Sequence, residues 1–275
     1  MQSLTSVRDT LSIDGYKHIT GTAMLEYLVT ARLVQLLEVE LPEGRMQEKF
    51  VVWGITESLE STEPLEILQA TARDGIICYF TAVHFHGLTT QGVSHHHIAR
   101  LRHYPQPQQG QKDRPESLGE RKAFDPLGSK QFTYRGMPYY LTQRERDLVV
   151  GVQRRYLDER TIIRITTLEQ TLLDALHRPM SCGGPAVVFE AWETALERLD
   201  ERRLAEYLEA IASSEVDRRV GYMLENLGHR PGGVLGERLA RMREELARAT
   251  NQTPIALLPG TESDSINPYW LVEVP

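Results

Sequence analysis

The chain of 275 residues contains only two cysteines, Cys78 and Cys182, which stand far apart in the sequence. A disulfide framework or a structural zinc site needs cysteines in pairs at short spacings, so we expect neither. No run of about 18 apolar residues is present, and the N-terminus has no apolar segment behind a basic start. The sequence therefore predicts a cytoplasmic protein in a reducing compartment, with no membrane partner.

Motifs for nucleotide binding and covalent catalysis are also missing from the sequence. There is no GxxxxGK[ST], GxGxxG, HExxH or GxSxG segment. The paired glycines 183 and 184 could cradle a phosphate at a helix start, but a turn between two helices is the simpler interpretation. We therefore predict no enzyme activity, no catalytic residues, no cofactor and no metal.

Positive charge is scarce overall and is concentrated in one segment. The net charge is -7, yet residues 100–165 carry 14 Lys and Arg against 8 Asp and Glu. Residues 166–275 carry 11 against 18. A chain coated in cations for indiscriminate nucleic-acid binding is excluded, and the central segment becomes the candidate basic surface.

Composition and length favour a globular protein of two domains. The hydrophobic fraction is 41% and the charged fraction 25%, which is ordinary for a chain with a packed core. We predict an α/β (α+β) fold. It would consist of an N-terminal winged-helix-like module over residues 1–58, then a larger mixed α/β interaction domain over 59–275 with a helical C-terminal part.

The N-terminal prediction rests on a helix followed by a hairpin. Residues 20–30 have apolar side chains at helical spacing, with Thr20 or Thr22 as the N-cap, and β-compatible runs follow at 33–41 and 50–53. A winged helix has this order of elements. The candidate DNA contacts are Thr20, Thr22, Arg32 and Lys49. Because cations are few, a packing or dimerisation module is the alternative.

The rest of the chain alternates helix and strand signals. We expect helices over 63–75 and 80–88, ended by Gly75 and Gly87, around a buried link. An exposed loop is expected over 105–130, and a hairpin around Arg135 and Gly136. The remaining expectations are a strand at 161–167, helices at 167–176, 185–199, 202–212, 215–227 and 234–249, and a closing strand at 269–274.

Histidines and carboxylates suggest a rival function. In a strand His95 and His97 would share one face, so a metal site is conceivable, although packed or solvent-facing histidines are the simpler interpretation. Glu169, Asp174 and Glu190 could in principle hold a divalent ion. The runner-up function is therefore a metal-dependent nuclease or phosphodiesterase.

The densest basic cluster lies within residues 141–156. Arginines follow each other closely there, and the surplus of charge sits between acidic flanks. A solvated face is one interpretation, and a surface for an acidic protein or a nucleic acid is the other. The residues of this candidate surface are Arg144, Arg146, Arg154 and Arg155.

Several blocks together resemble the AbiEi family, the antitoxins of type IV toxin–antitoxin systems. The blocks, in order, are YFTAVHFHGLT, a Tyr-bearing hairpin, IRITTLEQTLLDALHRPMSCGG, DRRVGYMLENLG and the closing YWLVEV. The resemblance covers roughly residues 60–228 and, more weakly, the last strand. These motifs maintain a fold, and accordingly we interpret Glu169, Asp174, Arg218 and Tyr222 as structural.

The resemblance implies a winged helix that represses its own operon by binding operator DNA. It also implies a C-terminal domain that opposes a cognate nucleotidyltransferase-like toxin, in a system of phage defence. The expected function is that of a non-enzymatic antitoxin and transcriptional regulator, and a pure protein-interaction module with a degenerate winged helix is a further alternative. The sequence does not fix the oligomeric state.

Overall fold

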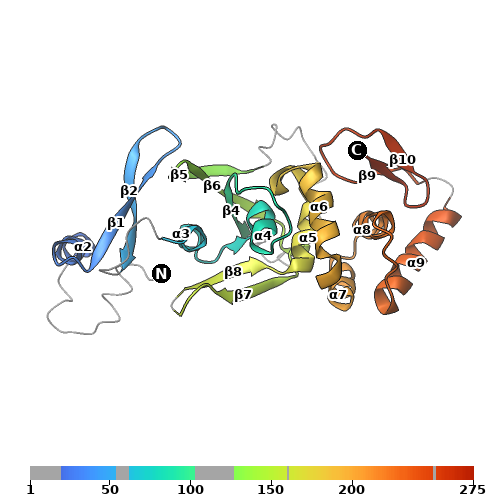
Figure 1. Ribbon diagram of the computed structural model, residues 1–275, viewed down its shortest axis with the longest axis horizontal. Helices are drawn as coiled ribbons and strands as arrows, with labels where there is room; N and C mark the ends of the chain where they lie inside the picture. The colour runs from blue at the N-terminus through green and yellow to red at the C-terminus, as the bar shows by residue number, and fades with distance from the viewer. Residues whose placement is uncertain (1–19, 54–61, 103–126, 160, 250–251) are drawn as a thin grey trace, which may run out of the picture.

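The computed structural model has a mixed α+β fold whose parts follow one another along its long axis (Figure 1). It describes residues 20–53, 62–102, 127–159, 161–249 and 252–275. The central feature is an eight-stranded mixed sheet with strand order β2-β1-β5-β6-β4-β3-β8-β7. A helical part and a small three-stranded sheet of order β10-β11-β9 follow. The predicted fold class is confirmed.

The N-terminal elements have the predicted order of helix and hairpin. Helix α2 (Gly21–Thr30) begins at the N-cap Thr20. It is followed by β1 (Val34–Glu40) and β2 (Met46–Trp53), which pair antiparallel. A small core of Met24, Leu28 and Val34 holds the helix against the hairpin.

The hairpin also belongs to the large sheet and its core. Strand β1 pairs with β5 (Ser129–Tyr134) through Glu40 and Thr133. The buried side chains of Leu37, Val39 and Phe50 join the cluster that fills one side of the sheet. The predicted boundary at 58/59 lies outside the described residues, and the apolar core continues across it.

The centre of the sheet is built from short parallel and antiparallel pairs. β3 (Ile76–Ile77) pairs antiparallel with β4 (His96–Leu101) and parallel with β8 (Ile162–Thr166), while β4 runs parallel to β6 (Met137–Arg144). α3 (Pro64–Thr71) contacts β3, β4 and β8. α4 (Tyr79–Phe85) follows β3 directly and packs against α5 (Leu168–His177). Residue 75 does not end a helix, because α3 stops at Thr71 and the chain then turns into β3.

The β5–β6 hairpin turns where the sequence predicts. Arg135 and Gly136 have φ angles of 53° and 78°, and two successive positive φ angles define the tight turn that matches strand twist. Glycine accommodates this backbone without strain. β7 (Val152–Tyr156) pairs antiparallel with β8 and forms one edge of the sheet.

The C-terminal part is helical, as predicted. Its helices are α6 (Pro185–Ala195), α7 (Glu201–Ile211), α8 (Ser214–Asn226) and α9 (Gly233–Arg248). β9 (Ile255–Ala256), β10 (Ser265–Asn267) and β11 (Val272–Val274) form the small sheet beside α8 and α9 (Figure 1). Trp192 and Trp270 are buried in the core of this part.

Two further expectations concern loops and membranes. Of the loop predicted over 105–130, residues up to 126 lie outside the described residues, and Ser129 onward is strand. Within the described ranges, every helix is too short or too polar to cross a bilayer.

Candidate functional site

The predicted DNA-contact residues are spread over the N-terminal helix and hairpin. The Oγ1 atom of Thr20 accepts a hydrogen bond from the Ala23 amide at 3.2 Å, so this hydroxyl is occupied in capping α2. Thr22 is exposed in the first turn, whereas Arg32 is exposed just beyond the last one. A helix of ten residues is about 15 Å long. Thr22 and Arg32 therefore mark opposite ends of α2.

Lys49 contacts the large sheet instead of lying free on the hairpin. Its Nζ atom is 4.9 Å from the ring centroid of Phe132 on β5, a cation–π geometry. Burial lowers the pKa of Lys49. This lysine therefore contacts β5 while its side chain remains exposed to solvent.

The exposed residues of α2 are polar and apolar in turn and include Glu26 but no Lys or Arg. Tyr27 is 62% exposed and Val29 37%, and Leu33 beyond the helix is 42% exposed. The surface of this helix offers aromatic and aliphatic contact with little charge.

Arg144 does not belong to the predicted basic surface, and this expectation is corrected. It is only 5% exposed and points into the protein from the end of β6. Arg146 lies in a 3-10 turn (Arg146–Leu148), and Arg154 and Arg155 lie on β7; all three are exposed. Neighbouring strand residues point to opposite faces, so Arg154 and Arg155 flank the sheet edge from both sides.

Arg144 instead forms a buried ion pair with Asp174 of α5. Its Nη1 donates to Asp174 Oδ2 at 2.6 Å and its Nη2 donates to Oδ1, and the guanidinium lies 4.9 Å from the centroid of the Tyr79 ring. Burial would lower the pKa of Arg144, but the Asp174 carboxylate raises it beyond its ordinary value. A bidentate ion pair fixes the relative orientation of the two side chains as well as their distance. This pair therefore holds the end of β6 against α5.

Gln170 connects the same carboxylate to the loop before β7. Its Nε2 donates to Asp174 Oδ1 at 2.8 Å and to the Leu148 carbonyl at 3.0 Å. Its Oε1 accepts the amides of Val150 and Gly151 at 2.9 and 3.0 Å. All four hydrogen-bonding positions of this buried amide are used, so it acts as a cross-link and not as a free polar group.

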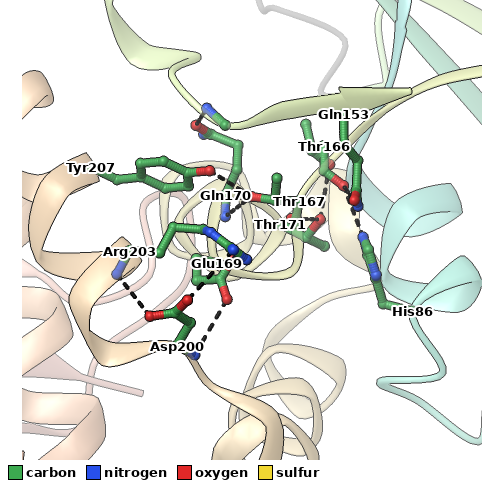
Figure 2. A network of polar contacts seen from close by, with 11 residues as sticks. His86, Gln153, Thr166, Thr167, Glu169, Gln170, Thr171, Asp200, Arg203 and Tyr207 are labelled. Atoms are coloured by element: carbon green, nitrogen blue, oxygen red, sulfur yellow. Dashed lines mark hydrogen bonds and ion pairs between the residues drawn. The ribbon is translucent and has the colours of Figure 1, made fainter. Parts of the chain in front are cut away.

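A second set of contacts joins the end of β8 to α4 and α5 (Figure 2). His86 Nε2 lies 2.8 Å from the Thr166 carbonyl, and because a carbonyl only accepts, this nitrogen carries the proton. Thr171 Oγ1 donates to the Thr167 carbonyl and lies 2.8 Å from Thr166 Oγ1. Thr166 is therefore the donor between the two hydroxyls. Gln153 Nε2 makes a long contact of 3.5 Å to the Thr166 carbonyl, which His86 also contacts.

Glu169 extends the network from α5 to the start of α7 (Figure 2). This carboxylate is 1% exposed. It accepts the amide of Asp200 at 3.3 Å and meets Arg203 at 3.4 Å. Asp200 in turn caps α7 by accepting the Arg203 amide, and Tyr207 lies 3.2 Å from the Thr167 hydroxyl.

The arrangement is suited to holding elements together. Its carboxylates face arginines or amides, its hydroxyls face carbonyls or each other, and Gln170 is saturated. Burial raises the pKa of the Cys78 thiol to about 12, which keeps it protonated and a poor nucleophile. The residues interpreted as structural, Glu169 and Asp174, lie in this network, and Arg218 binds the carbonyls of Trp270 and Thr253.

The histidine triplet is packed inside the sheet. His95, His96 and His97 are 6%, 7% and 0% exposed. His95 stacks on Phe80 at 5.3 Å, and His97 meets Tyr79 edge-on at 4.8 Å. Among the described residues, no three His, Cys, Asp or Glu side chains are grouped so that they could hold a metal ion.

The other two features singled out in the sequence also have local roles. Glu190 accepts hydrogen bonds from the Thr89 hydroxyl at 2.6 Å and the Thr90 amide at 2.7 Å, which ties α6 to the segment after α4. Residues 183 and 184, with φ angles of 95° and 91°, make the turn between a 3-10 turn and α6. This is the predicted turn.

Sequence reasoning missed His86, Gln170, Arg203 and Tyr207 as members of the network. Gln170 lies inside residues 167–174 of the third block, where the sequence has the pattern Thr-Leu-Glu-x-Thr-Leu-x-Asp, so its position was a signal that could have been used. Arg203 and Tyr207 come from α7, 34 and 40 residues beyond their partners, Glu169 and Thr167. No local pattern reports such a distant contact.

The solved structures include a protein that is similar to this chain. No family model matches the chain, and no curated protein matches it. The chain is similar to the protein in the "Crystal structure of RV2827C protein from Mycobacterium tuberculosis". The two are 14% identical with a TM-score of 0.48, over 98% of this chain and 84% of that one.

Proposed function

We propose that this chain is a non-enzymatic antitoxin of a type IV toxin–antitoxin system in phage defence, and that it represses its own operon by binding operator DNA. The observation that carries the proposal is the helix–hairpin unit of α2, β1 and β2, which has the element order of a winged helix. The order of blocks that resembles the AbiEi family supports it.

The positions of those blocks are consistent with a scaffold that presents surfaces. The Thr-Leu-Glu-x-Thr-Leu-x-Asp block forms α5, and its polar side chains bind neighbouring elements. Residues 218–225 of the fourth block, with the pattern Arg-Arg-x-Gly-Tyr-x-Leu-Glu, form part of α8, where Arg218 and Arg219 donate to backbone carbonyls. Such residues stabilise the fold, and the protein would act through contacts between its surface and other macromolecules.

The proposed partners are operator DNA and a nucleotidyltransferase-like toxin made in the same cytoplasm. The helix–hairpin unit would meet DNA through Thr22, Arg32 and the residues near them. The exposed arginines 146, 154 and 155 would contact acidic groups of the toxin or a nucleic acid around the edge strand β7, with Arg154 and Arg155 on opposite faces of that strand.

A gel shift with DNA from upstream of the chain's own reading frame tests DNA binding at two salt concentrations. Binding that rests on phosphate contacts weakens steeply with salt. Replacing Arg32 with Ala should weaken binding and reduce the salt slope by about one. Arg230→Ala, at an exposed arginine far from the unit in sequence, is the matched control and should change neither.

Co-expression with the toxin tests the antitoxin role. The wild-type chain should restore growth, and a double charge reversal, Arg154→Glu with Arg155→Glu, should reduce the rescue while leaving the DNA shift intact. A chain that neither shifts its upstream DNA nor restores growth is not such an antitoxin. A chain that restores growth without a shift is the pure interaction module.

The rival nuclease function makes a different prediction. Labelled DNA or RNA would be cleaved in Mn²⁺ or Mg²⁺, and cleavage would disappear in a His95→Ala, His97→Ala variant. Both imidazoles are buried against aromatic rings, which does not favour this function. Cleavage with that dependence would replace the present proposal.

A further inference from the structure

A cavity of about 400 Å³ opens beside the start of α3, against α4 and β4. The lining residues differ in exposure. The side chains of His96 and Thr81 are buried, those of Leu65 and Phe85 are half-buried, and those of Glu63 and His84 are exposed. Ligand sites of this volume are typically apolar with a few polar groups that fix orientation.

His96 is the unusual member of this lining. Its side chain is only 7% exposed, and its Nδ1 atom has no hydrogen-bond partner within the described part of the chain. Its ring lies 4.8 Å from that of Tyr139. A buried polar atom without a partner costs free energy, and a ligand in the cavity would supply the missing partner.

The charge of the lining restricts the ligand. Burial, with smaller contributions from His95 and His84, lowers the pKa of His96 to about 4, so its imidazole is neutral at neutral pH. Among the described residues that line the cavity there is no lysine or arginine, and Glu63 supplies a carboxylate. A phosphate or carboxylate ligand would meet Glu63 without a cation to offset it, so anions are disfavoured.

The shape and polarity of the lining select for a flat molecule with N–H donors. Phe85 and His96 place aromatic side chains in the lining, and aromatic rings pack well against flat molecules. Glu63 offers two acceptor oxygens that suit a pair of adjacent N–H groups. The Thr81 Oγ1 already accepts the His97 amide at 2.7 Å, and its hydroxyl hydrogen can still be donated.

We propose that this cavity binds an uncharged or cationic planar molecule that presents two adjacent N–H donors to Glu63 and a ring nitrogen to His96. A guanine base has both features, whereas a small amidine has the two N–H donors for Glu63 and lacks the ring nitrogen. The volume admits a base with its sugar. This site stands on its own geometry and does not depend on the antitoxin function.

Calorimetry on the full chain with guanosine, inosine and benzamidine tests the proposal and separates the two sources. Inosine lacks the second donor, so guanosine should bind at least about tenfold more tightly if the ligand is a guanine base. Binding of benzamidine alone would assign the site to an amidine. If none of the three binds with a Kd below about 1 mM, the proposal is overturned.

Variants tie any binding to the cavity. Glu63→Gln and His96→Phe should each raise Kd about tenfold or more. Glu66→Gln, on the same helix but outside the lining, should leave Kd unchanged. Val93→Trp blocks the cavity from a half-buried position and should abolish binding in a chain whose circular dichroism is unaltered. Binding that survives in the first two variants and in Val93→Trp lies elsewhere and overturns the proposal.

Discussion

Arg144 and Asp174 are almost closed to solvent, at 5% and 1% exposure. Removing one partner of a buried ion pair leaves the other charge without compensation. We expect Asp174→Ala to lower the free energy of unfolding by about 3–5 kcal/mol, measured by urea denaturation. Arg146→Ala, at the exposed neighbour, should change it by about 0.5 kcal/mol or less. Equal effects from the two variants would contradict the burial of Arg144.

The neutral histidines predict a loss of stability in acid. His96 has an ordinary pKa of 6.5 and a folded pKa of about 4, so the unfolded chain binds its proton first. Its contribution is complete above pH 6.5 and is lost as the pH falls from 6.5 toward 4, at up to about 1.4 kcal/mol per pH unit. Burial also lowers the pKa of His97 well below its ordinary value, with the same sign.

Urea denaturation at pH 7.5 and pH 5 measures this effect. The difference in unfolding free energy between the two pH values should shrink in His96→Phe, because Phe keeps a ring in the site and cannot take up a proton. His84→Gln, at an exposed histidine that makes only a small contribution to the pKa of His96, should change the difference much less than His96→Phe does. An unchanged pH dependence in His96→Phe would show that His96 already titrates normally when folded.

The roles of individual side chains were harder to predict from the sequence than the helices and strands. The sequence does not distinguish the buried Arg144 from the exposed arginines near it, because its partner Asp174 is 30 residues away. Glu169 and Asp174 were recognised as structural from the block in which they occur, not from any visible partner. A local pattern records the type of a side chain, but its role depends on what the fold places opposite it.

At the scale of elements, Gly151 sets how closely β7 approaches α7. A methyl group at this position would lie 2.4 Å from the Tyr207 ring and 2.6 Å from Thr167 Oγ1. We expect Gly151→Ala to cost about 1–3 kcal/mol of unfolding free energy, because the ring and the helix cap must both shift. Gly92→Ala, where a methyl group meets nothing within 4 Å, is the control. Thermal unfolding followed by circular dichroism compares them, and equal midpoints would contradict the crowding.

Elements were more predictable than residues because their signals are local. Thr20 and Thr167 cap helices, and the Arg135–Gly136 turn lies where the sequence indicates. The end of α3 was missed because Gly75 resembles a helix stop, although the preceding residues had already left the helix. Pairing partners, such as β1 with β5, depend on contacts across the fold and were not predictable.

At the scale of the whole molecule, the first hairpin and the large sheet share one core. Leu37 is fully buried in the cluster that includes Ile67 and Ile163. We expect Leu37→Ala to lower the unfolding free energy by about 2–5 kcal/mol and to lower the urea midpoint reported by the buried Trp192. Leu25→Ala, in the separate small core under α2, should affect that midpoint less. A midpoint unmoved by Leu37→Ala would mean that the hairpin unfolds on its own.

The buried histidine triplet has a practical consequence for anyone handling this protein. Three consecutive imidazoles would be expected to retain a chain on nickel resin, yet His95, His96 and His97 are enclosed by aromatic rings in the native state. The triplet therefore becomes available to immobilised nickel only after denaturation. The additional retention in urea, compared with a variant that lacks the three histidines, is a simple readout of how much of a preparation has lost its native packing.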